Sequence, residues 1–196
     1  MKKILIFFYI FFYSLNNVYA QEFKLEKIID GLDSPWSLSF IDKENILFTE
    51  KPGKLYLLNL KNKKISEIKH DLNVLEYGQG GLLDVLFRDN IIYVSYSENR
   101  GNWETSTTVA KGIFDKEKII FKNIFRAEPP IDSGYHFGSR LVISDKHLYV
   151  TAGERGQGMI AQDVTKHPGS IIRINLDGSI PKDNPKFKGK KDWLPE

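Results

Sequence analysis

A histidine lies in a glycine-bearing loop that leads into a strand-like apolar run. The loop is Ser133–Leu141, His136 lies near its centre, and Val142-Ile143 continue the run. Free imidazole titrates close to neutral pH, so a histidine held at the edge of a cavity can act as a general base. A lone loop histidine is also often a surface residue or a hydrogen-bonded structural one. This segment alone leaves both interpretations open.

Two further glycine-rich loops carry polar side chains. In Tyr77–Asp84, Gln79 can both donate and accept hydrogen bonds, which suits a hydroxyl-rich substrate, although the loop could equally be a tight turn. In Thr151–Gly158, the planar guanidinium of Arg155 could bind a carboxylate or the oxygens of a quinone. The alternative is a surface ion pair between Arg155 and Glu154, which would contribute little stability.

Other sites are disfavoured by spacing and composition. Gly156–Ala161 matches a dinucleotide fingerprint, but Pro168 follows and no helix is expected to receive a pyrophosphate. The four histidines show no metal-ligand spacing, so no metal ligand is nominated, and the chain has no cysteine. The net charge of +3 without a basic stripe argues against a nucleic-acid partner.

Residues 1–20 have the pattern of a secretory signal peptide. Lys2 and Lys3 precede the apolar run Ile4–Leu15, and Val18-Tyr19-Ala20 resembles a cleavage site. Removing both lysines takes the net charge from +3 to +1. We expect a periplasmic or secreted protein with no membrane span after cleavage, the alternative being an uncleaved N-terminal anchor.

The rest of the chain, residues 21–196, reads as a series of short strands rich in aromatic and β-branched residues. Three similar triplets follow one another. The expected first strands are Trp36–Phe40, Leu82–Phe87 and Ser139–Ile143; the second are Ile46–Glu50, Ile91–Ser95 and His147–Thr151; the third are Lys54–Leu60, Thr105–Phe114 and Ser170–Leu176.

The repeat predicts an all-β fold with about three four-stranded blades of a β-propeller. Corresponding strands recur at roughly 45 to 57 residues, the length of such a blade. An irregular β-sandwich would also contain short strands, but it does not explain triplets in the same order. Because propellers close with four to eight blades, we expect residues 21–196 to be the N-terminal half of a larger propeller domain.

Four motifs in order resemble the soluble PQQ-dependent sugar dehydrogenases, the glucose/sorbosone dehydrogenase family, and its aldose sugar dehydrogenase branch most. They are Gly31–Leu38, Gly78–Asp84, His136–Val142 and Arg173–Pro185. The resemblance implies a six-bladed propeller that binds pyrroloquinoline quinone (PQQ) and calcium. It also implies oxidation of an aldose at its C1 hydroxyl to a lactone, with hydride passing to the quinone.

The resemblance also implies roles for individual residues. His136 takes the position of the family's base, and Gln79 that of the glutamine that touches the sugar. Tyr135, also expected at the substrate, replaces an aspartate that supports the base in the glucose-oxidising branch. Arg155 stands where that branch has a glutamine near the cofactor. The calcium ligands are expected in later blades, in the C-terminal half of the domain.

Two other functions remain open at this point. A propeller can keep its scaffold and serve as a noncatalytic binding module. A calcium propeller could hydrolyse a lactone or ester, although the chain lacks a clustered carboxylate signature. The sequence identifies neither the sugar nor the electron acceptor.

Overall fold

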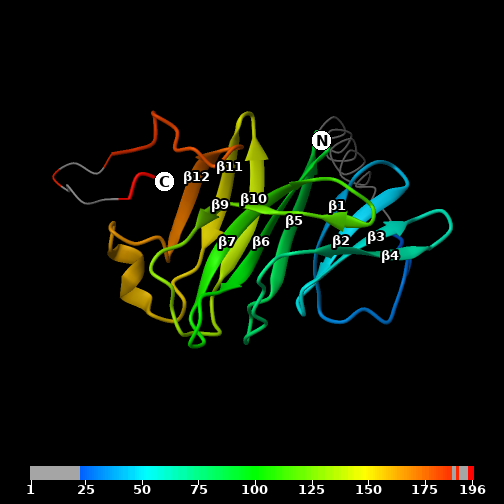
Figure 1. Ribbon diagram of the computed structural model, residues 1–196, viewed down its shortest axis with the longest axis horizontal. Coiled ribbons are helices and arrows are strands. Elements are labelled where there is room, and N and C mark those ends of the chain that lie inside the picture. The colour runs from blue at the N-terminus through cyan, green and yellow to red at the C-terminus, as the bar shows by residue number, and fades with distance from the viewer. Residues whose placement is uncertain (1–22, 187–188, 190–193) are drawn as a thin grey trace, which may run out of the picture.

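Three β-sheets, in which nearly all strand pairs are antiparallel, stand side by side along the long axis of the protein (Figure 1). The computed structural model describes residues 23–186, 189 and 194–196. Within this part of the chain the one helical segment is a short 3-10 turn, η1 (Gly158–Gln162). The predicted all-β class is therefore confirmed.

Each sheet is built mainly from strands that are consecutive in the chain. The first sheet has the order β1 (Pro35–Phe40), β2 (Asn45–Glu50), β3 (Lys54–Asn59), β4 (Ile65–His70), β8 (Lys118–Ile119). The second has β5 (Leu82–Arg88), β6 (Ile91–Asn99), β7 (Thr105–Ile113), β9 (Lys122–Arg126). The third has β10 (Gly138–Ser144), β11 (His147–Ala152), β12 (Ser170–Asn175).

The nine strands expected as three triplets are all present, but the expectation of four strands in every sheet is wrong. The second sheet has four strands, whereas the first has five and the third has three. The fifth strand of the first sheet is β8, which comes from the connection between β7 and β9 and pairs in parallel with β4. A pairing of only two residues leaves no alternating pattern that could be recognised beforehand.

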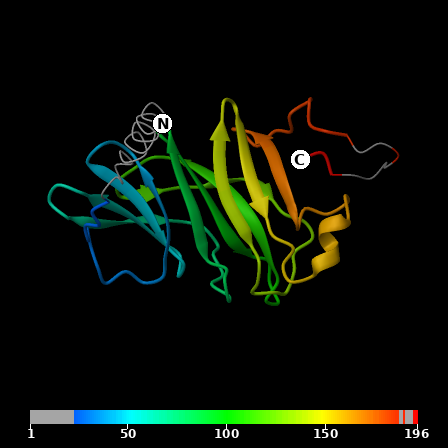
Figure 2. The ribbon, with the colours of Figure 1, turned by 180° about the vertical axis from the view of Figure 1, so that it is seen from behind.

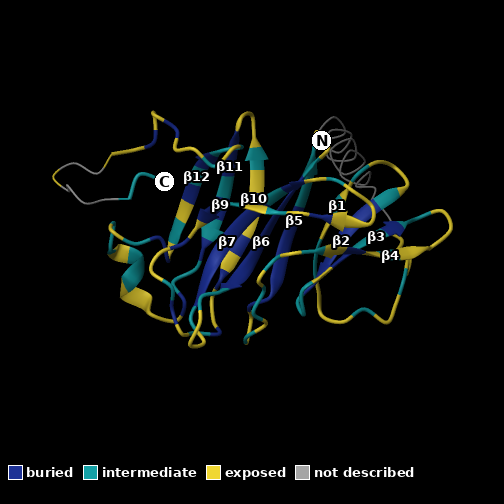
Figure 3. Ribbon diagram, in the orientation of Figure 1, coloured by how far each residue is buried: buried dark blue, intermediate teal, exposed yellow. Residues whose placement is uncertain are grey.

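The second sheet lies in the middle, and much of it is buried (Figure 3). Apolar side chains pack on both of its faces. Along β6, Ile92 and Val94 pack toward the first sheet, whereas Tyr93 packs toward the third. This follows from the period of two in a strand, which sends neighbouring side chains to opposite faces. The two interfaces between sheets therefore form two separate cores.

A buried carboxylate joins the first strands of all three sheets. Asp84 on β5 accepts hydrogen bonds from the Ser37 hydroxyl on β1 and from the Leu141 backbone N–H on β10, the latter at 2.7 Å. Figure 2 shows β5 and β10 side by side from behind. Because charge-assisted hydrogen bonds are strong, this contact fixes the strand that carries the histidine loop relative to its neighbours.

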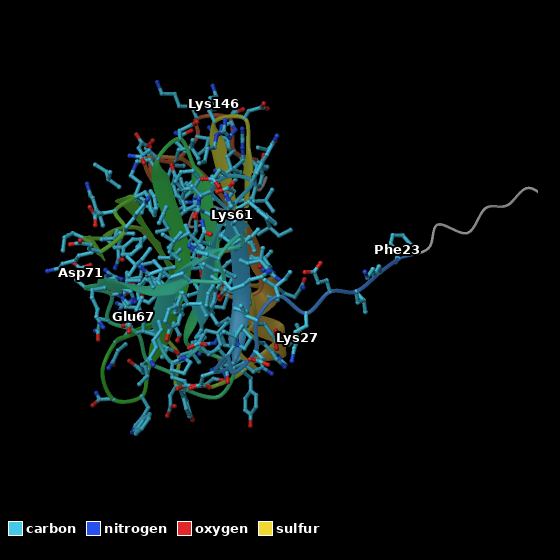
Figure 4. The ribbon with its side chains drawn as sticks, turned by 90° about the vertical axis from the view of Figure 1, so that its right-hand side faces the viewer. Phe23, Lys27, Lys61, Glu67, Asp71 and Lys146 are labelled. Atoms are coloured by element: carbon cyan, nitrogen blue, oxygen red, sulfur yellow. The ribbon has the colours of Figure 1, made fainter. Side chains whose placement is uncertain are left out.

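The N-terminal residues of the described chain run away from the sheets. Figure 4 shows Phe23 and Lys27 on this extended segment, and the Phe23 side chain is 83% exposed. The signal peptide predicted over residues 1–20 lies outside the described residues. Among the residues that are described, no helix has the length and apolar character needed to cross a bilayer.

Candidate functional site

The β10–β11 hairpin brings His136 and Glu154 together at its open end. Gly138 is the register partner of Ala152, and the Gly153 N–H donates to the Phe137 carbonyl at 3.0 Å, which extends the pairing one step further. One more step along the same register places His136 opposite Glu154. Their side chains meet, with the imidazole Nδ1 hydrogen-bonded to Glu154 Oε1.

This contact determines which imidazole nitrogen is free. An ionised carboxylate only accepts hydrogen bonds, so Nδ1 of His136 must carry the proton that is shared with Glu154. In the neutral ring, Nε2 then keeps its lone pair. The His136 side chain is 54% exposed and the Glu154 side chain 27%. The ring is therefore held from one side and open to a ligand on the other.

The charge on Glu154 is stabilised locally. The hydrogen bond from His136 lowers the pKa of the Glu154 carboxyl below its ordinary value, and backbone N–H groups add to this effect. The N–H of Gly156 donates to the carboxylate at 3.1 Å. Glu154 is consequently ionised at neutral pH, as the hydrogen bond to His136 Nδ1–H requires.

Gln79 positions the histidine from the opposite loop. The backbone N–H of His136 donates to Gln79 Oε1 at 2.9 Å, and the Gln79 N–H donates to the Gly134 carbonyl at 2.7 Å. His136 adopts a left-handed φ of 48°, which is uncommon for a residue other than glycine. The two bonds from the Gln79 loop fix this conformation. Among the described residues the Gln79 NH₂ group has no hydrogen-bond acceptor, so it can donate to another partner.

Glycines permit this close approach of backbones. At Gly153, a Cβ atom would lie 1.8 Å from the His136 carbonyl oxygen. At Gly78, where φ is +59°, a Cβ atom would lie 2.4 Å from the Gly134 carbonyl oxygen. No side chain fits at either position, so the glycines of the motif loops serve to seat the histidine segment between its neighbours.

Arg155 is buried beneath the histidine loop. The residue is 3% exposed, and its guanidinium carbon lies 3.6 Å above the centroid of the Phe137 ring. It donates to the carbonyl oxygens of Tyr135 at 3.0 Å, Thr105 at 3.1 Å and Ser133, and to the Thr105 hydroxyl at 2.7 Å. The predicted cofactor contact of Arg155 stays untested, but these contacts give the guanidinium a role within the chain's own loops.

The Arg155 charge has no acidic partner among the described residues, and the surface ion pair with Glu154 considered from the sequence does not form. Burial lowers the pKa of Arg155 to about 10, so it remains charged at neutral pH. Carbonyl dipoles from the segments around Thr105 and Ser133–Tyr135 therefore solvate the cation. Glu154 and Arg155 are adjacent in sequence, yet one faces the imidazole and the other the interior.

Tyr135 lies beside the imidazole on the exposed side of the loop. Its side chain is 61% exposed, and its ring centroid lies 6.2 Å from that of His136 in an edge arrangement. The ring can line a binding surface next to the base. Its predicted contact with a substrate stays a prediction.

The described residues fit a proton-accepting site better than a metal site. No group of three or more His, Cys, Asp or Glu side chains in this part of the chain could hold a metal ion. His136 with Glu154 offers a nitrogen that can accept a proton.

Sequence reasoning missed Glu154 as the partner of the imidazole. The two residues are 18 positions apart. Both strands of the hairpin were predicted, and continuing their register beyond the strand ends would have paired His136 with Glu154. It was obscured by the irregularity in register between Gly138 and Leu141.

Comparison with known proteins gives consistent results. A sequence model of the family "Glucose / Sorbosone dehydrogenase" matches residues 32–196. Aldose sugar dehydrogenase YliI from Escherichia coli strain K12 is 35% identical in an alignment over 174 residues that covers 84% of this chain and 47% of that protein. Quinoprotein glucose dehydrogenase B from Acinetobacter calcoaceticus is 27% identical, over 87% of this chain and 43% of that protein.

Solved structures agree in fold. The apo-form of the soluble aldose sugar dehydrogenase from Escherichia coli superposes with a TM-score of 0.78 at 34% identity, covering 84% of this chain and 50% of that one. The PQQ-bound aldose sugar dehydrogenase from Streptomyces coelicolor gives a TM-score of 0.73 at 25% identity, covering 84% and 51%. The chain spans about half the length of the curated relatives it matches.

Proposed function

The chain belongs to the glucose/sorbosone dehydrogenase family, and we propose on that basis that its protein oxidises the C1 hydroxyl of aldose sugars to lactones. PQQ, when bound, would accept the hydride from C1. The relatives named as aldose sugar dehydrogenases, one of them with PQQ bound, support this proposal. The wider proposal includes a six-bladed propeller, a calcium ion held by later blades, and a periplasmic or secreted location.

The hydrogen bond between His136 and Glu154 carries the proposal. The reaction removes a proton from the C1 oxygen and a hydride from the C1 carbon, while a C=O bond forms. Nε2 of His136 has the free lone pair that can take the oxygen-bound proton, and Glu154 stabilises the imidazolium that results. The Gln79 NH₂ group and Tyr135 are available to orient sugar hydroxyls beside the ring.

A noncatalytic binding module would need the same scaffold but not this tautomer. A surface imidazole with a purely structural role would not need an unprotonated Nε2. In this chain, Glu154 binds the exposed ring of His136, the Gln79 side chain accepts from the His136 backbone N–H, and the buried Arg155 cation binds the same loop from below. This concentration of positioning contacts favours catalysis over simple binding.

Replacement of the histidine in the purified protein tests the proposal. With PQQ and Ca²⁺ added and an artificial electron acceptor present, aldose should reduce the acceptor. His136→Gln should lower kcat by about 10²- to 10⁴-fold, the usual contribution of a general base. His70→Gln is the matched control, because His70 lies on β4 and contacts the Gly53 carbonyl at 2.9 Å. Unchanged turnover in His136→Gln would refute the role of the base.

A further inference from the structure

The hairpin between β6 and β7 ends in a strained tip that exposes a tryptophan. Three consecutive residues have left-handed backbone angles: Gly101 at φ 86°, Asn102 at 50° and Trp103 at 66°. For a bulky aromatic residue such a conformation is a true outlier and stores backbone strain. In this conformation Trp103 remains 63% exposed.

The tip is nevertheless held firmly. The Arg100 N–H donates to the Glu104 carbonyl and the Glu104 N–H to the Gly101 carbonyl, both at 2.9 Å. The Arg100 guanidinium bonds the Ser106 hydroxyl at 2.9 Å and the Glu128 carboxylate at 2.8 Å. An exposed indole on a rigid, strained turn is a preformed contact surface.

This surface is connected to the histidine site. The Trp103 ring lies against Tyr77, with centroids 5.6 Å apart and the planes tilted by 55°. Tyr77 opens the loop in which Gln79 binds the His136 backbone, and its carbonyl accepts from the Gly80 N–H at 2.9 Å. The β6–β7 tip and the loop that enters β10 lie at the same end of the molecule (Figure 1). Tyr135 adds an exposed ring next to His136.

The β6–β7 hairpin belongs to the second sheet, which the first and third sheets already cover on both faces. The exposed apolar residues on the outer faces of the first and third sheets, such as Leu38 and Ile171, are different in this respect. The aromatic surface at the tip lies at the end of the protein that carries the His136 loop (Figure 1).

We propose that Trp103 and Tyr77, continued by Tyr135, form a platform for a second sugar ring beside the one at His136. The proposal rests on the proposed function and names its substrate class: reducing oligosaccharides whose end unit faces the imidazole. A pyranose ring presents C–H groups on its faces, and these pack on aromatic rings while the hydroxyls at its edge stay in water. The platform carries no charge of its own, which suits a neutral ligand.

Indole NMR tests binding without any cofactor. The chain has three tryptophans, so a ¹⁵N-labelled sample gives at most three indole N–H signals, and Trp103→Phe identifies that of Trp103. Maltotriose should shift this signal saturably, and Trp103→Ala should weaken maltotriose binding by roughly tenfold. Ile171→Ala, which removes a side chain that is 71% exposed on β12, is the matched control and should bind normally.

Steady-state kinetics of the PQQ-loaded enzyme provide a second test of the platform. Trp103→Ala should raise the ratio of KM for maltotriose to KM for glucose by roughly tenfold, whereas Ile171→Ala should leave it unchanged. If the PQQ-loaded enzyme oxidised none of the sugars, the proposed function would be refuted. The NMR experiment would still show whether Trp103 binds maltotriose. An unshifted Trp103 signal at saturating maltotriose would overturn the platform. A shift of the Trp103 signal on addition of PQQ alone would also overturn the platform, because it would indicate that the indole contacts the quinone.

Discussion

The histidine loop and the β6–β7 tip lie at the same end of the protein and use similar backbone, but they are stabilised differently. His136 has a φ of 48° and is followed by Gly138 and Ser139, both at 68°, while the tip has its own left-handed run at 101–103. Under the histidine loop lies the buried guanidinium of Arg155. The tip is held instead by its own turn and by Arg100, whose side chain is 25% exposed.

The difference separates two tasks. A general base must be placed accurately relative to the reacting atoms, since small displacements reduce rates strongly. Its loop is therefore fixed by buried contacts from other segments. A stacking surface tolerates a wider range of ligand positions, so an exposed tip with local hydrogen bonds suffices. Substitutions in the first region should affect stability and chemistry together, and those in the second should mainly affect binding.

The largest expected difference is in the free energy of unfolding when each of the two arginines is replaced by alanine. Arg155→Ala removes the guanidinium donor from the carbonyl oxygens of Tyr135 and Ser133 and one of the two donors to the Thr105 carbonyl, and it should lower the free energy of unfolding by about 3 kcal/mol or more. Arg100→Ala removes a partly exposed ion pair and should cost about 0.5 kcal/mol. Urea denaturation of both variants measures the contrast. Equal losses would show that the two loops are held alike.

Sequence reasoning could not have placed Arg155 in the interior. Arginine is usually exposed, and its burial here depends on backbone oxygens from two segments that meet only in the fold, around Thr105 and around Ser133–Tyr135. The nine main strands were predictable because alternation and aromatic content are local properties. The histidine, the glutamine and their loops were found from motifs, whereas the role of Glu154 required the register of β10 and β11.

A smaller effect is expected from the pH dependence of the Glu154 contact. The hydrogen bond from His136 lowers the pKa of Glu154 below its ordinary value of 4.5. A lowered pKa in the folded state stabilises the fold above pH 4.5, and this contribution is lost as the pH falls through the lowered value. Glu154→Gln removes it.

Unfolding of the wild type and of Glu154→Gln should therefore be compared between neutral pH and about pH 3. The stability difference should be constant at neutral pH and shrink on acidification. Asp163→Asn is a suitable control, because Asp163 also has a lowered pKa, caused by its hydrogen bonds to Thr165 rather than by an imidazole. A difference that grew on acidification would contradict the assigned contact.

The tautomer of His136 is the most direct test of the whole account. At a pH where the imidazole is neutral, ¹⁵N NMR of the ring should show Nδ1 protonated and Nε2 unprotonated, with Glu154→Gln disturbing this state. The chain has four histidines, so His136→Gln assigns the signals unambiguously. A ring with its proton on Nε2 in the wild type would contradict the account, because no lone pair would then face the substrate.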